Sequence, residues 1–296
     1  MSVENKKRGT RLTCGDAFVC IGIFSFVYAS FALQEIPTEE KGGNFEENSM
    51  KSMGKMGSSS SSNTKTATKI GVKSDEKSVR ILCVGDSLTE GYYQGGRHFS
   101  PYTDTLEKLL KNEYSETKWE VVNYGISGFE GGMMKDLYDL KIEEAWKAGK
   151  TFDIVIVLGG INDIGGGKKP KHVLENPHGI RALVKSALKD NALVFILTVA
   201  EYAEEMRQRG KVRKDRMELN EGLKSLAAEH KNSVLLDFAN EFPYFALSET
   251  KKEELWDDGL HYKPAGYERM GEIVFEALQS ELHRILPPKN DEKKQE

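Results

Sequence analysis

The sequence predicts an α/β domain of three layers over residues 76–290, with helices on both faces of a five-stranded parallel sheet. Short β-branched segments recur along this part of the chain, and helical patterns lie between them. Several of these segments are apolar throughout, as in IVIVLGG at 154–160, which is typical of parallel strands buried on both faces. Strands that alternate with crossover helices favour a sheet covered on both sides.

The expected strands are the segments richest in apolar and β-branched residues. They are short, and glycine or polar residues follow most of them. The five are Val79–Val84, Glu120–Asn123, Asp153–Leu158, Ala192–Val199 and Ser233–Asp237.

Helices are expected where apolar residues recur every three or four positions. Pro101 suits a first helical turn, because the N–H that it lacks would have no partner there. The charged stretch Glu204–Glu221 predicts a helix with a solvated face, or alternatively a lid beside a site. The apolar stripes are formed by Leu106, Leu109 and Leu110, by Leu219, Leu223 and Leu226, and by Ile273, Phe275 and Leu278 of a final helix.

Composition limits the class of protein. Hydrophobic residues make up 39% of the 296 residues, with 28 glycines besides, which lies in the globular range. The net charge of −4 argues against general nucleic-acid binding through phosphates. Three cysteines exclude a disulfide scaffold, and Cys83, inside the first expected strand, is expected to be a buried free thiol. Nothing in the sequence fixes an oligomeric state.

The first 75 residues differ in charge and composition from the rest. They hold 10 Lys and Arg and 8 Asp and Glu, which gives a net charge of +2. Residues 76–296 hold 32 Lys and Arg and 38 Asp and Glu, which gives a net charge of −6. Residues 34–75 contain few apolar side chains and an unbroken serine run at 58–62. Such a segment cannot bury enough apolar surface to offset its ordering entropy, which predicts a disordered linker.

Residues 17–33 are uncharged, and 14 of these 17 residues are apolar. As a helix they would span ~25 Å, slightly less than a ~30 Å hydrocarbon core. Basic residues precede the run and acidic residues follow it, which places the N-terminus on the cytoplasmic side. Residues 1–33 therefore predict a signal peptide or an uncleaved signal anchor, with organelle targeting or a buried helix as alternatives. The expected location is the secretory pathway, either secreted or tethered to a membrane through 17–33.

Glycine-rich and polar segments follow the expected strands. Ligands bind outside the carboxyl ends of strands in open α/β sheets, so these segments are the candidates for chemistry. If the strands are predicted correctly, the segments that follow the first three strands lie at one edge of the sheet. The segments are Gly85–Gly91, Asn123–Gly128 and Gly159–Asp163, and Asp257–His261 comes after the fifth strand.

Ser87 is the candidate nucleophile, in a turn that Gly85 permits. A serine hydroxyl needs a base to attack, and His261 is a suitable one. Asp258 lies three residues before His261, where it could orient the imidazole and stabilise its charged form. Asp257 is the alternative orienting acid.

Three donors could stabilise an oxyanion at this edge: the N–H groups of Ser87 and Gly128 and the side-chain amide of Asn162. Asp86 and Asp163 are expected either to brace the loops as hydrogen-bond acceptors or to stabilise ordinary turns. Gly165–Lys169 looks like a phosphate loop but lacks its spacing, so we expect a rim loop there.

Four sequence blocks in order resemble the GDSL, or SGNH, hydrolase family. They are GDSL at 85–88, ISG at 126–128, GGIND at 159–163 and DGLH at 258–261. The family's Ser, Gly, Asn and His fall on Ser87, Gly128, Asn162 and His261, and its catalytic Asp falls on Asp258. The resemblance covers about 79–284. It implies a flavodoxin-like sheet and hydrolysis of acyl esters or thioesters without a metal or cofactor.

The expected function is therefore that of a serine hydrolase acting on a small-molecule acyl ester. A small-acyl esterase is the default, and a lysophospholipase, a thioesterase or a carbohydrate acetylesterase remain open. Transfer of the acyl group to another alcohol is a variant, and a non-catalytic ligand-binding protein on the same fold is the alternative. Trp119, Trp146 and Trp256 are expected in the core, although Trp256 could instead line an acyl pocket.

Overall fold

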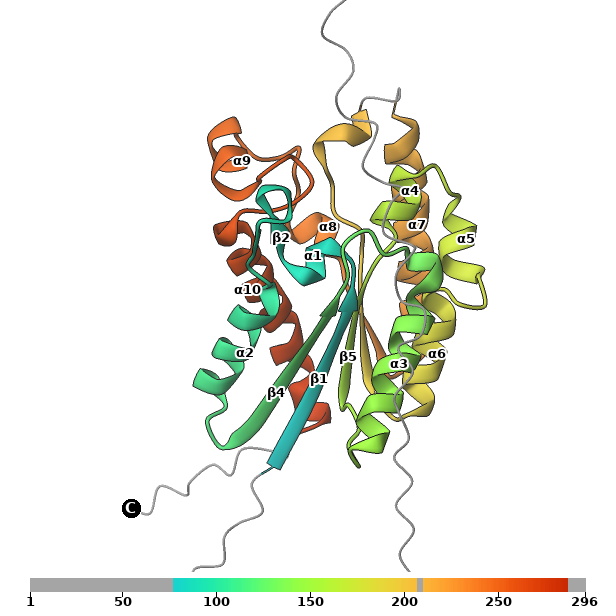
Figure 1. Cartoon of the computed structure of the whole chain (residues 1–296), viewed down its shortest axis with the longest axis vertical. Helices are drawn as coiled ribbons and strands as arrows, with labels where there is room; N and C mark the ends of the chain where they lie inside the picture. The colour runs from blue at the N-terminus through green and yellow to red at the C-terminus, as the bar shows by residue number, and fades with distance from the viewer. Residues whose placement is uncertain (1–76, 207–209, 287–296) are drawn as a thin grey trace, which may run out of the picture. The chain divides into compact units, whose positions relative to one another are not determined.

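The computed structural model describes residues 77–206 and 210–286 (Figure 1). These residues fall within the predicted domain 76–290. The predicted targeting segment 1–33 and the predicted linker 34–75 lie outside the described residues, so both stay predictions. Within the described part of the chain, no helix is long and apolar enough to cross a membrane.

A parallel sheet of five strands forms the centre of the described residues, which confirms the predicted fold class. The strand order is β4-β1-β5-β6-β7, which is the flavodoxin-like order of a doubly wound sheet. Each strand overlaps one of the expected segments. The strands are β1 (Lys77–Gly85), β4 (Thr117–Gly125), β5 (Ile154–Leu158), β6 (Leu193–Leu197) and β7 (Ser233–Leu236).

The register of β4, β1 and β5 brings their carboxyl ends to one level. Gly85, the last residue of β1, pairs with Gly125 at the end of β4 and with Leu158 at the end of β5. The segments that follow these strands therefore begin side by side. This alignment places Ser87, Gly128 and Asn162 at the same edge, as the sequence predicts.

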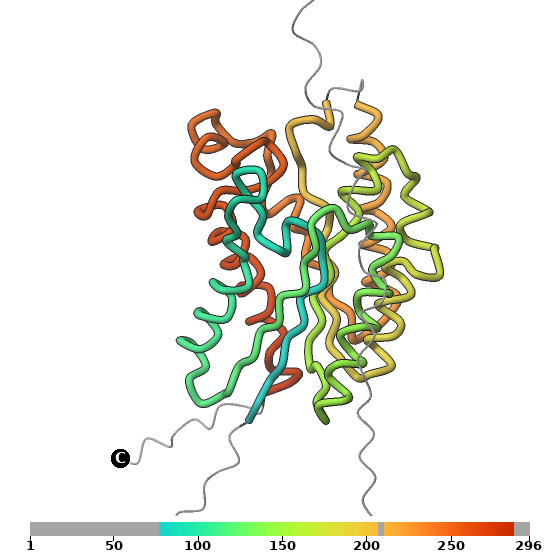
Figure 2. The backbone as a smooth tube through the Cα atoms, viewed as in Figure 1, coloured from blue at the N-terminus to red at the C-terminus, as the bar shows by residue number. Residues whose placement is uncertain are grey.

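Two hydrophobic cores lie on the two faces of the sheet, because successive side chains of a strand point to opposite faces. Leu82 and Val84 of β1 belong to one core, whereas Ile81 and Cys83 belong to the other. Figure 2 shows the two helical layers with the sheet between them. α3 (Met134–Lys147), α6 (Ile180–Lys189) and α7 (Lys211–Ala228) cover one face, and α2 (Tyr102–Glu113) and α10 (Pro264–Glu281) cover the other (Figure 1).

α2 and α10 pack closely against each other because Gly271 faces α2. A Cβ at Gly271 would lie 2.7 Å from the carbonyl oxygen of Tyr102 and equally close to Cβ of Thr105. Pro101 precedes α2 as its cap instead of occupying its first turn. This packing fixes α10, and α10 begins three residues after His261.

Short elements at the carboxyl edge and between the main helices complete the described chain. At the edge, α1 (Ser87–Glu90) leads into a hairpin of β2 (Tyr92–Tyr93) and β3 (His98–Phe99) around η1 (Gln94–Gly96). The remaining elements are η2 (Gly131–Met133), α4 (Ile161–Gly165), α5 (Pro170–Glu175), η3 (Ala203–Met206), α8 (Phe238–Glu241), α9 (Glu249–Leu255) and η4 (Leu282–Arg284).

Burial differs from the sequence-based expectation at two places. The stretch Glu204–Glu221 is not simply solvated, because Glu205 and Arg216 are 0% and 3% exposed and form an ion pair with each other. Trp146 is 58% exposed in the last turn of α3, so its expected place in the core is wrong. The core residues in that part of α3 are Ile142 and Ala145, so burial ends one residue before Trp146.

The other expected core residues are buried. Trp119 and Trp256 are each 4% exposed, and the ring of Trp256 stacks on that of Phe242 at 4.7 Å. Trp256 is thus part of the core next to α9. Cys83 is a buried free thiol, as predicted, and burial raises its pKa to about 12.

Candidate active site

Ser87 lies in the tight turn between β1 and α1. Asp86 caps α1, since its Oδ1 accepts a hydrogen bond from the N–H of Leu88 at 3.0 Å. Gly85 is required by close packing: a Cβ there would lie 2.0 Å from Oγ1 of Thr89 and 2.9 Å from the carbonyl oxygen of Leu158. The sequence around Ser87 therefore folds into a turn that directs the hydroxyl toward the carboxyl edge.

A continuous hydrogen-bonded chain links Ser87 to His261 and Asp258. Nε2 of His261 lies 2.9 Å from Oγ of Ser87, although the two residues are 174 positions apart. Nδ1 of His261 lies 2.7 Å from Oδ2 of Asp258. The structure thus brings together the three residues that the sequence predicts as nucleophile, base and orienting acid.

The loop that carries His261 is closed by its own hydrogen bonds. Oδ1 of Asp258 accepts from the N–H groups of Leu260 at 3.0 Å and of His261 at 2.7 Å. The N–H of Asp257 donates to the carbonyl oxygen of His261. Burial alone would raise the pKa of Asp258, but the hydrogen bonds from the ring and N–H of His261 and from Leu260 outweigh it and lower that pKa to about 2. The carboxylate is therefore ionised at neutral pH.

Asp257, the alternative orienting acid, has a different partner. Its Oδ2 accepts a hydrogen bond from the backbone N–H of Gln94 at 2.6 Å. That contact ties the histidine loop to the β2–β3 hairpin. Of the two aspartates, it is Asp258 that contacts the imidazole of His261.

Tyr92, which the sequence reasoning did not single out, packs against His261. The two ring centroids are 4.6 Å apart. The hydroxyl of Tyr267, in α10, donates to the carbonyl oxygen of Tyr92 at 2.7 Å and so holds β2 in place. An aromatic residue a few positions after a candidate nucleophile is the only sequence signal for this contact.

The turn after β4 carries Gly128. It is formed by hydrogen bonds from the N–H of Ile126 to the carbonyl of Gly85 at 3.1 Å, and from the N–H of Phe129 to the carbonyl of Ile126 at 3.0 Å. Gly128 has φ +77, which favours glycine. Among the described residues, the N–H groups of Gly128 and Ser87 have no hydrogen-bond acceptor. With respect to the described part of the chain, both can therefore donate to an anion.

Glu90 and Asn123 hold this turn in position, and the sequence reasoning did not identify either. Oε2 of Glu90 accepts from the N–H of Ser127 at 2.9 Å and also from its hydroxyl. Nδ2 of Asn123 donates to the carbonyl of Thr89 at 2.6 Å, while its Oδ1 accepts from the N–H of Gly125 at 2.9 Å. These contacts fasten the turn after β4 to α1.

Asn162 lies in the first turn of α4, after Gly160 with φ +110. Its Nδ2 donates to the carbonyl oxygen of Phe129 at 2.8 Å. This bond uses one of the two amide hydrogens and leaves the other for a further acceptor. It also fixes the amide beside the turn that carries Gly128.

The two predicted bracing aspartates differ in their contacts. Asp163 is buried, and its carboxylate accepts from the N–H of Gly131 at 2.6 Å and of Gly132 at 3.3 Å, so it joins the loop after β5 to the loop after β4. Asp86 stays within its own turn, and its Oδ2 has no partner in the described part of the chain. Burial raises the pKa of Asp163, and it raises the pKa of Asp86 to about 7.

The lysines of the predicted rim loop are paired with carboxylates. Lys168 forms an ion pair with Glu130, and Nζ of Lys169 lies 3.6 Å from Oδ1 of Asp215. These contacts do not leave a phosphate site at Gly165–Lys169. Across residues 77–206 and 210–286, no cluster of three or more His, Cys, Asp or Glu side chains is arranged to hold a metal ion.

A serine, a histidine and an ionised aspartate in one hydrogen-bonded chain, next to free N–H groups at the carboxyl edge of a parallel sheet, are the groups found in carboxylic ester hydrolases. Residues 83–269 match the model of the GDSL-like lipase/acylhydrolase family. The chain belongs to this family, which confirms the resemblance seen in the sequence and the class of enzyme that it implies.

Solved structures show the same fold. A lipase/acylhydrolase from Enterococcus faecalis is 20% identical with a TM-score of 0.53, and the match covers 69% of this chain and 96% of that one. A psychrotrophic esterase from Pseudoalteromonas sp. is 20% identical with a TM-score of 0.52, and the match covers 69% of this chain and 98% of the esterase. An acetylxylan esterase from Geobacillus stearothermophilus is 22% identical with a TM-score of 0.52, covering 68% and 94%. No curated protein matches the chain.

Proposed function

We propose that the protein hydrolyses small acyl esters, with Ser87 as nucleophile, His261 as general base and acid, and Asp258 as the orienting carboxylate. The observation that carries the proposal is the hydrogen-bonded chain in which His261 lies 2.9 Å from Ser87 Oγ and 2.7 Å from Asp258 Oδ2. In this reaction Ser87 Oγ attacks the ester carbonyl carbon while Nε2 of His261 takes the hydroxyl proton.

The tetrahedral intermediate carries its negative charge on the former carbonyl oxygen. The free N–H groups of Ser87 and Gly128, together with the second amide hydrogen of Asn162, are the proposed donors to that oxygen. When the intermediate collapses, His261 gives its proton to the leaving alkoxide, so the alcohol departs and an acyl-enzyme remains. Water then repeats the two steps, its proton passing to His261 and on to Ser87 Oγ, and the carboxylic acid is released.

Asp258 supports both steps because it is ionised throughout the neutral range. Its pKa of about 2 leaves a negative charge 2.7 Å from Nδ1 of His261. That charge stabilises the imidazolium that forms when Ser87 loses its proton. It also fixes the tautomer in which Nε2 is the proton acceptor.

Apolar side chains at the rim support a substrate with an apolar group. Phe99 is 51% exposed, and it is the cross-strand partner of Tyr92, whose ring contacts His261. Because paired residues in a hairpin share a face, Phe99 lies on the same side of the hairpin as the imidazole. Ile126 is 37% exposed in the turn beside Gly85. We expect these two side chains to contact the acyl or alkoxy group.

The test is covalent labelling of the purified domain with a fluorophosphonate, combined with hydrolysis of p-nitrophenyl acetate. The label is expected on Ser87, and Ser87→Ala is expected to remove both labelling and hydrolysis while the circular dichroism spectrum stays unchanged. Hydrolysis by Ser87→Ala at the wild-type rate contradicts the proposal, and a wild-type protein that is neither labelled nor active favours a ligand-binding protein instead.

The same assay separates the finer substrate classes. A series of p-nitrophenyl esters of increasing chain length, a lysophospholipid, an acyl thioester and an acetylated xylan distinguish the acyl and head groups. An added alcohol that forms a new ester in competition with water indicates acyl transfer.

We also propose that residues 1–33 direct the protein to the secretory pathway. The support is the charge pattern around 17–33, with basic residues before it and acidic residues after it. N-terminal sequencing of the native protein tests the two forms. A first residue near Leu33 indicates a cleaved signal peptide, and an intact Met1 in the membrane fraction indicates an anchor.

A further inference from the structure

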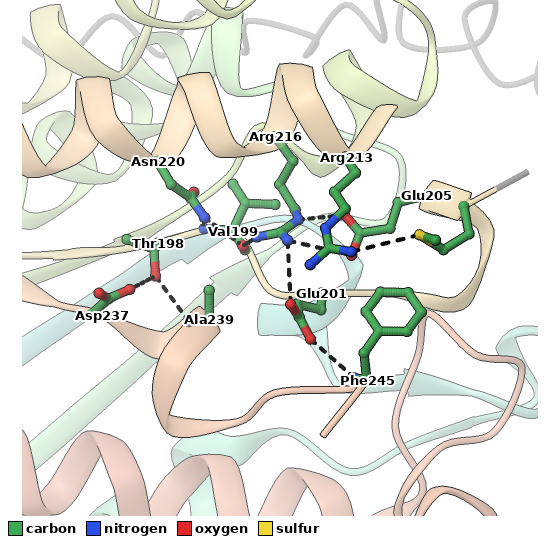
Figure 3. Close-up of polar contacts among 11 residues, drawn as sticks. Thr198, Val199, Glu201, Glu205, Arg213, Arg216, Asn220, Asp237, Ala239 and Phe245 are labelled. Carbon is green, nitrogen blue, oxygen red and sulfur yellow. Dashed lines mark hydrogen bonds and ion pairs between the residues drawn. The ribbon is translucent and has the colours of Figure 1, made fainter. Parts of the chain in front are cut away.

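The segment that follows β6 is held from the inside by a buried arginine of α7. Figure 3 shows the guanidinium of Arg216 between two carboxylates. Its Nε lies 2.6 Å from Oε2 of Glu205 and its Nη2 lies 3.4 Å from Oε1 of the same residue. Nη2 also lies 3.6 Å from Oε1 of Glu201, and Nη1 donates to the carbonyl oxygen of Val199 at 3.3 Å. One side chain thus contacts three positions of the segment.

This cluster is costly to bury. The side chains of Arg216 and Glu205 are 4% and 0% exposed, and that of Glu201 is 15% exposed. Desolvation of buried ions is expensive, and well-packed apolar residues in their place are often equally stable or more stable. Stability alone is therefore a weak reason for this arrangement. A guanidinium with fixed donors does, however, define where each of its acceptors must lie.

Asn220, one turn after Arg216 on the same face of α7, adds a second attachment. Its Nδ2 donates to the carbonyl of Val199 at 3.0 Å, and its Oδ1 accepts from the N–H of Val199 at 2.8 Å. Both backbone groups of Val199 are therefore satisfied by α7 (Figure 3). The chain from Val199 to Glu205 is fixed at both ends by this helix.

The segment in turn contacts the loop that carries His261. The N–H of Ala203, midway between Glu201 and Glu205, donates to the carbonyl oxygen of Gly259 at 2.9 Å. Gly259 has φ +84, and a Cβ on it would lie 2.7 Å from Cβ of Ala203. The two segments are in close contact at Gly259, which lies between Asp258 and His261.

Glu201 makes a second connection in the same direction. Its Oε2 accepts from the backbone N–H of Phe245 at 3.0 Å, while its Oε1 faces Arg216 (Figure 3). The chain around Phe245 leads through α9 to Asp258. Arg216 is therefore connected to the histidine loop by two sets of contacts, one through Ala203 and one through Glu201.

The internal bonds of the histidine loop define its shape but not its distance from Ser87. Asp258 closes the loop on itself through Leu260 and His261. The distance to Ser87 depends on the contacts of the loop with its surroundings. These are the bridge between Trp256 and Tyr262 at its base, Ala203 on one side, and Gln94 and Tyr92 on the other. A displacement on the scale of ~1 Å in such a catalytic geometry can lower the rate ~10²-fold.

We propose that Arg216 is a positioning residue for the esterase reaction: by holding Glu201 and Glu205 it keeps the N–H of Ala203 against the carbonyl of Gly259, and so keeps His261 within hydrogen-bonding distance of Ser87. The inference rests on the proposed roles of Ser87, Asp258 and His261. It assigns no contact between Arg216 and the substrate.

The test is the double variant Arg216→Met with Glu205→Gln, which removes both charges of the closest ion pair together. Its kcat for p-nitrophenyl acetate is expected to fall about 10- to 100-fold, with a KM within about threefold of the wild type, because chemistry and not binding is affected. The rate of fluorophosphonate labelling at Ser87 is expected to fall by the same factor. The melting temperature shows that the variant is folded.

A control ion pair is available toward the amino ends of the strands. Arg80 of β1 forms a bidentate pair with Glu120 at 2.9 Å and also donates to the backbone carbonyl of Thr151 at 2.8 Å. The side chains of Arg80 and Glu120 are 13% and 39% exposed, so this pair is less buried than that of Arg216 and Glu205. Arg80→Met with Glu120→Gln changes a similar cluster far along the strands from Ser87, and its kcat is expected to stay at the wild-type value.

A second variant tests the route through Ala203 without touching the ions. Ala203→Pro removes the N–H that donates to the carbonyl oxygen of Gly259. Ala203 is the first residue of the short helix η3, and proline is tolerated at that position of a helix. Its kcat is expected to fall to a similar extent. When it is combined with the double variant, the two losses are expected to be much less than additive, because both act through the same contact.

Three outcomes overturn the inference: a folded double variant with wild-type kcat, additive losses in the combination, or an equal loss of kcat in the control at Arg80. If the double variant does not fold, a wild-type kcat for Ala203→Pro overturns it in the same way, and a reduced kcat supports it. A wild-type protein without labelling at Ser87 contradicts the proposed function itself, and that result is distinct from all of these.

Discussion

Carboxylates are buried at the carboxyl edge of the sheet both near the nucleophile and after β6. Their hydrogen-bond partners differ between the two places. On the nucleophile side, Asp86 and Asp163 are 0% exposed, and their hydrogen bonds come from backbone N–H groups. On the side of β6, Glu205 is equally buried, but it faces the guanidinium of Arg216 at 2.6 Å. In the first arrangement, Asp163 joins the loop after β5 to the loop after β4, whereas Asp86 caps the turn that carries Ser87.

The second arrangement holds an irregular segment against a helix and a distant loop. Backbone groups alone reach only about 3 Å, whereas arginine and glutamate side chains together bridge a much wider gap. The difference shows why the ion pair is buried at a place where the chain between two elements has no regular structure to fix it. It also gives opposite expectations for the same kind of substitution on the two sides.

The largest expected effect is that of Glu205→Gln. Removing one partner of a buried pair leaves Arg216 incompletely compensated, so the free energy of unfolding is expected to fall by about 3–5 kcal/mol. Urea unfolding at pH 7 measures it. An unchanged stability would mean that Glu201 alone suffices for Arg216, and the contrast between the two sides would disappear.

Asp86→Asn is the opposite case, because within the described residues the carboxylate of Asp86 is held by the backbone N–H of Leu88 and not by an ion pair. Its pKa rises from an ordinary value of 3.8 to about 7 in the folded state through burial, so the folded protein binds the proton more tightly than the unfolded chain. The wild-type free energy of unfolding is therefore expected to fall between about pH 4 and pH 7, by up to about 4 kcal/mol.

The amide introduced by Asp86→Asn cannot titrate, so the variant lacks this contribution. The difference in unfolding free energy between wild type and variant, measured from about pH 4 to pH 8, reports the titration of Asp86 together with its coupling to His261 and Asp163. Parallel curves for the two proteins over this range would show that Asp86 ionises freely, against the burial seen here.

Asn162→Ala tests the proposed oxyanion donor on the nucleophile side. Loss of one such donor costs about 10²–10³ in kcat, or about 2.7–4 kcal/mol. The KM is expected to change little, because the interaction forms mainly in the transition state. Steady-state kinetics on p-nitrophenyl acetate measures both parameters, and a loss that is confined to KM would assign Asn162 to substrate binding instead.

Ser127→Ala is expected to have the smallest effect. It removes the hydroxyl contact with Glu90 but keeps the 2.9 Å bond from the backbone N–H of Ser127. A net contribution of about 0.5–1.5 kcal/mol per hydrogen bond limits the loss in kcat/KM to roughly tenfold. A much larger loss would place the hydroxyl of Ser127 among the groups that bind the substrate.

The candidate site could be predicted from the sequence because its residues follow strand ends. Apolar runs identify the strands, and parallel strands in one sheet bring their carboxyl ends to the same edge. The register that pairs Gly85 with Gly125 and Leu158 then places Ser87, Gly128 and Asn162 together. His261 lies well beyond the end of β7, so no strand end fixes its position, and the Asp258–His261 spacing and the order of the four family blocks pointed to it.

Arg216 could have been noticed from its spacing. It lies three residues before Leu219 and seven before Leu223, so it belongs to the apolar stripe of α7 and faces the core. A long run of charged residues around it suggested a solvated helix face instead. Its partner Glu205 lies in a separate element, and no periodicity relates the two.

The sequence by itself determined the fold class, the edge of the sheet where chemistry is expected and the residues proposed to carry it, because local periodicity and short motifs are read directly from the chain. Only the tertiary structure decided which charged side chains are buried and which aromatic ring is exposed, as at Glu205 and Trp146. Those outcomes depend on the rotation of each helix against its neighbours and on contacts between segments far apart in the chain. The physical reason is that the burial of a side chain is a property of its surroundings, which residues distant in sequence supply.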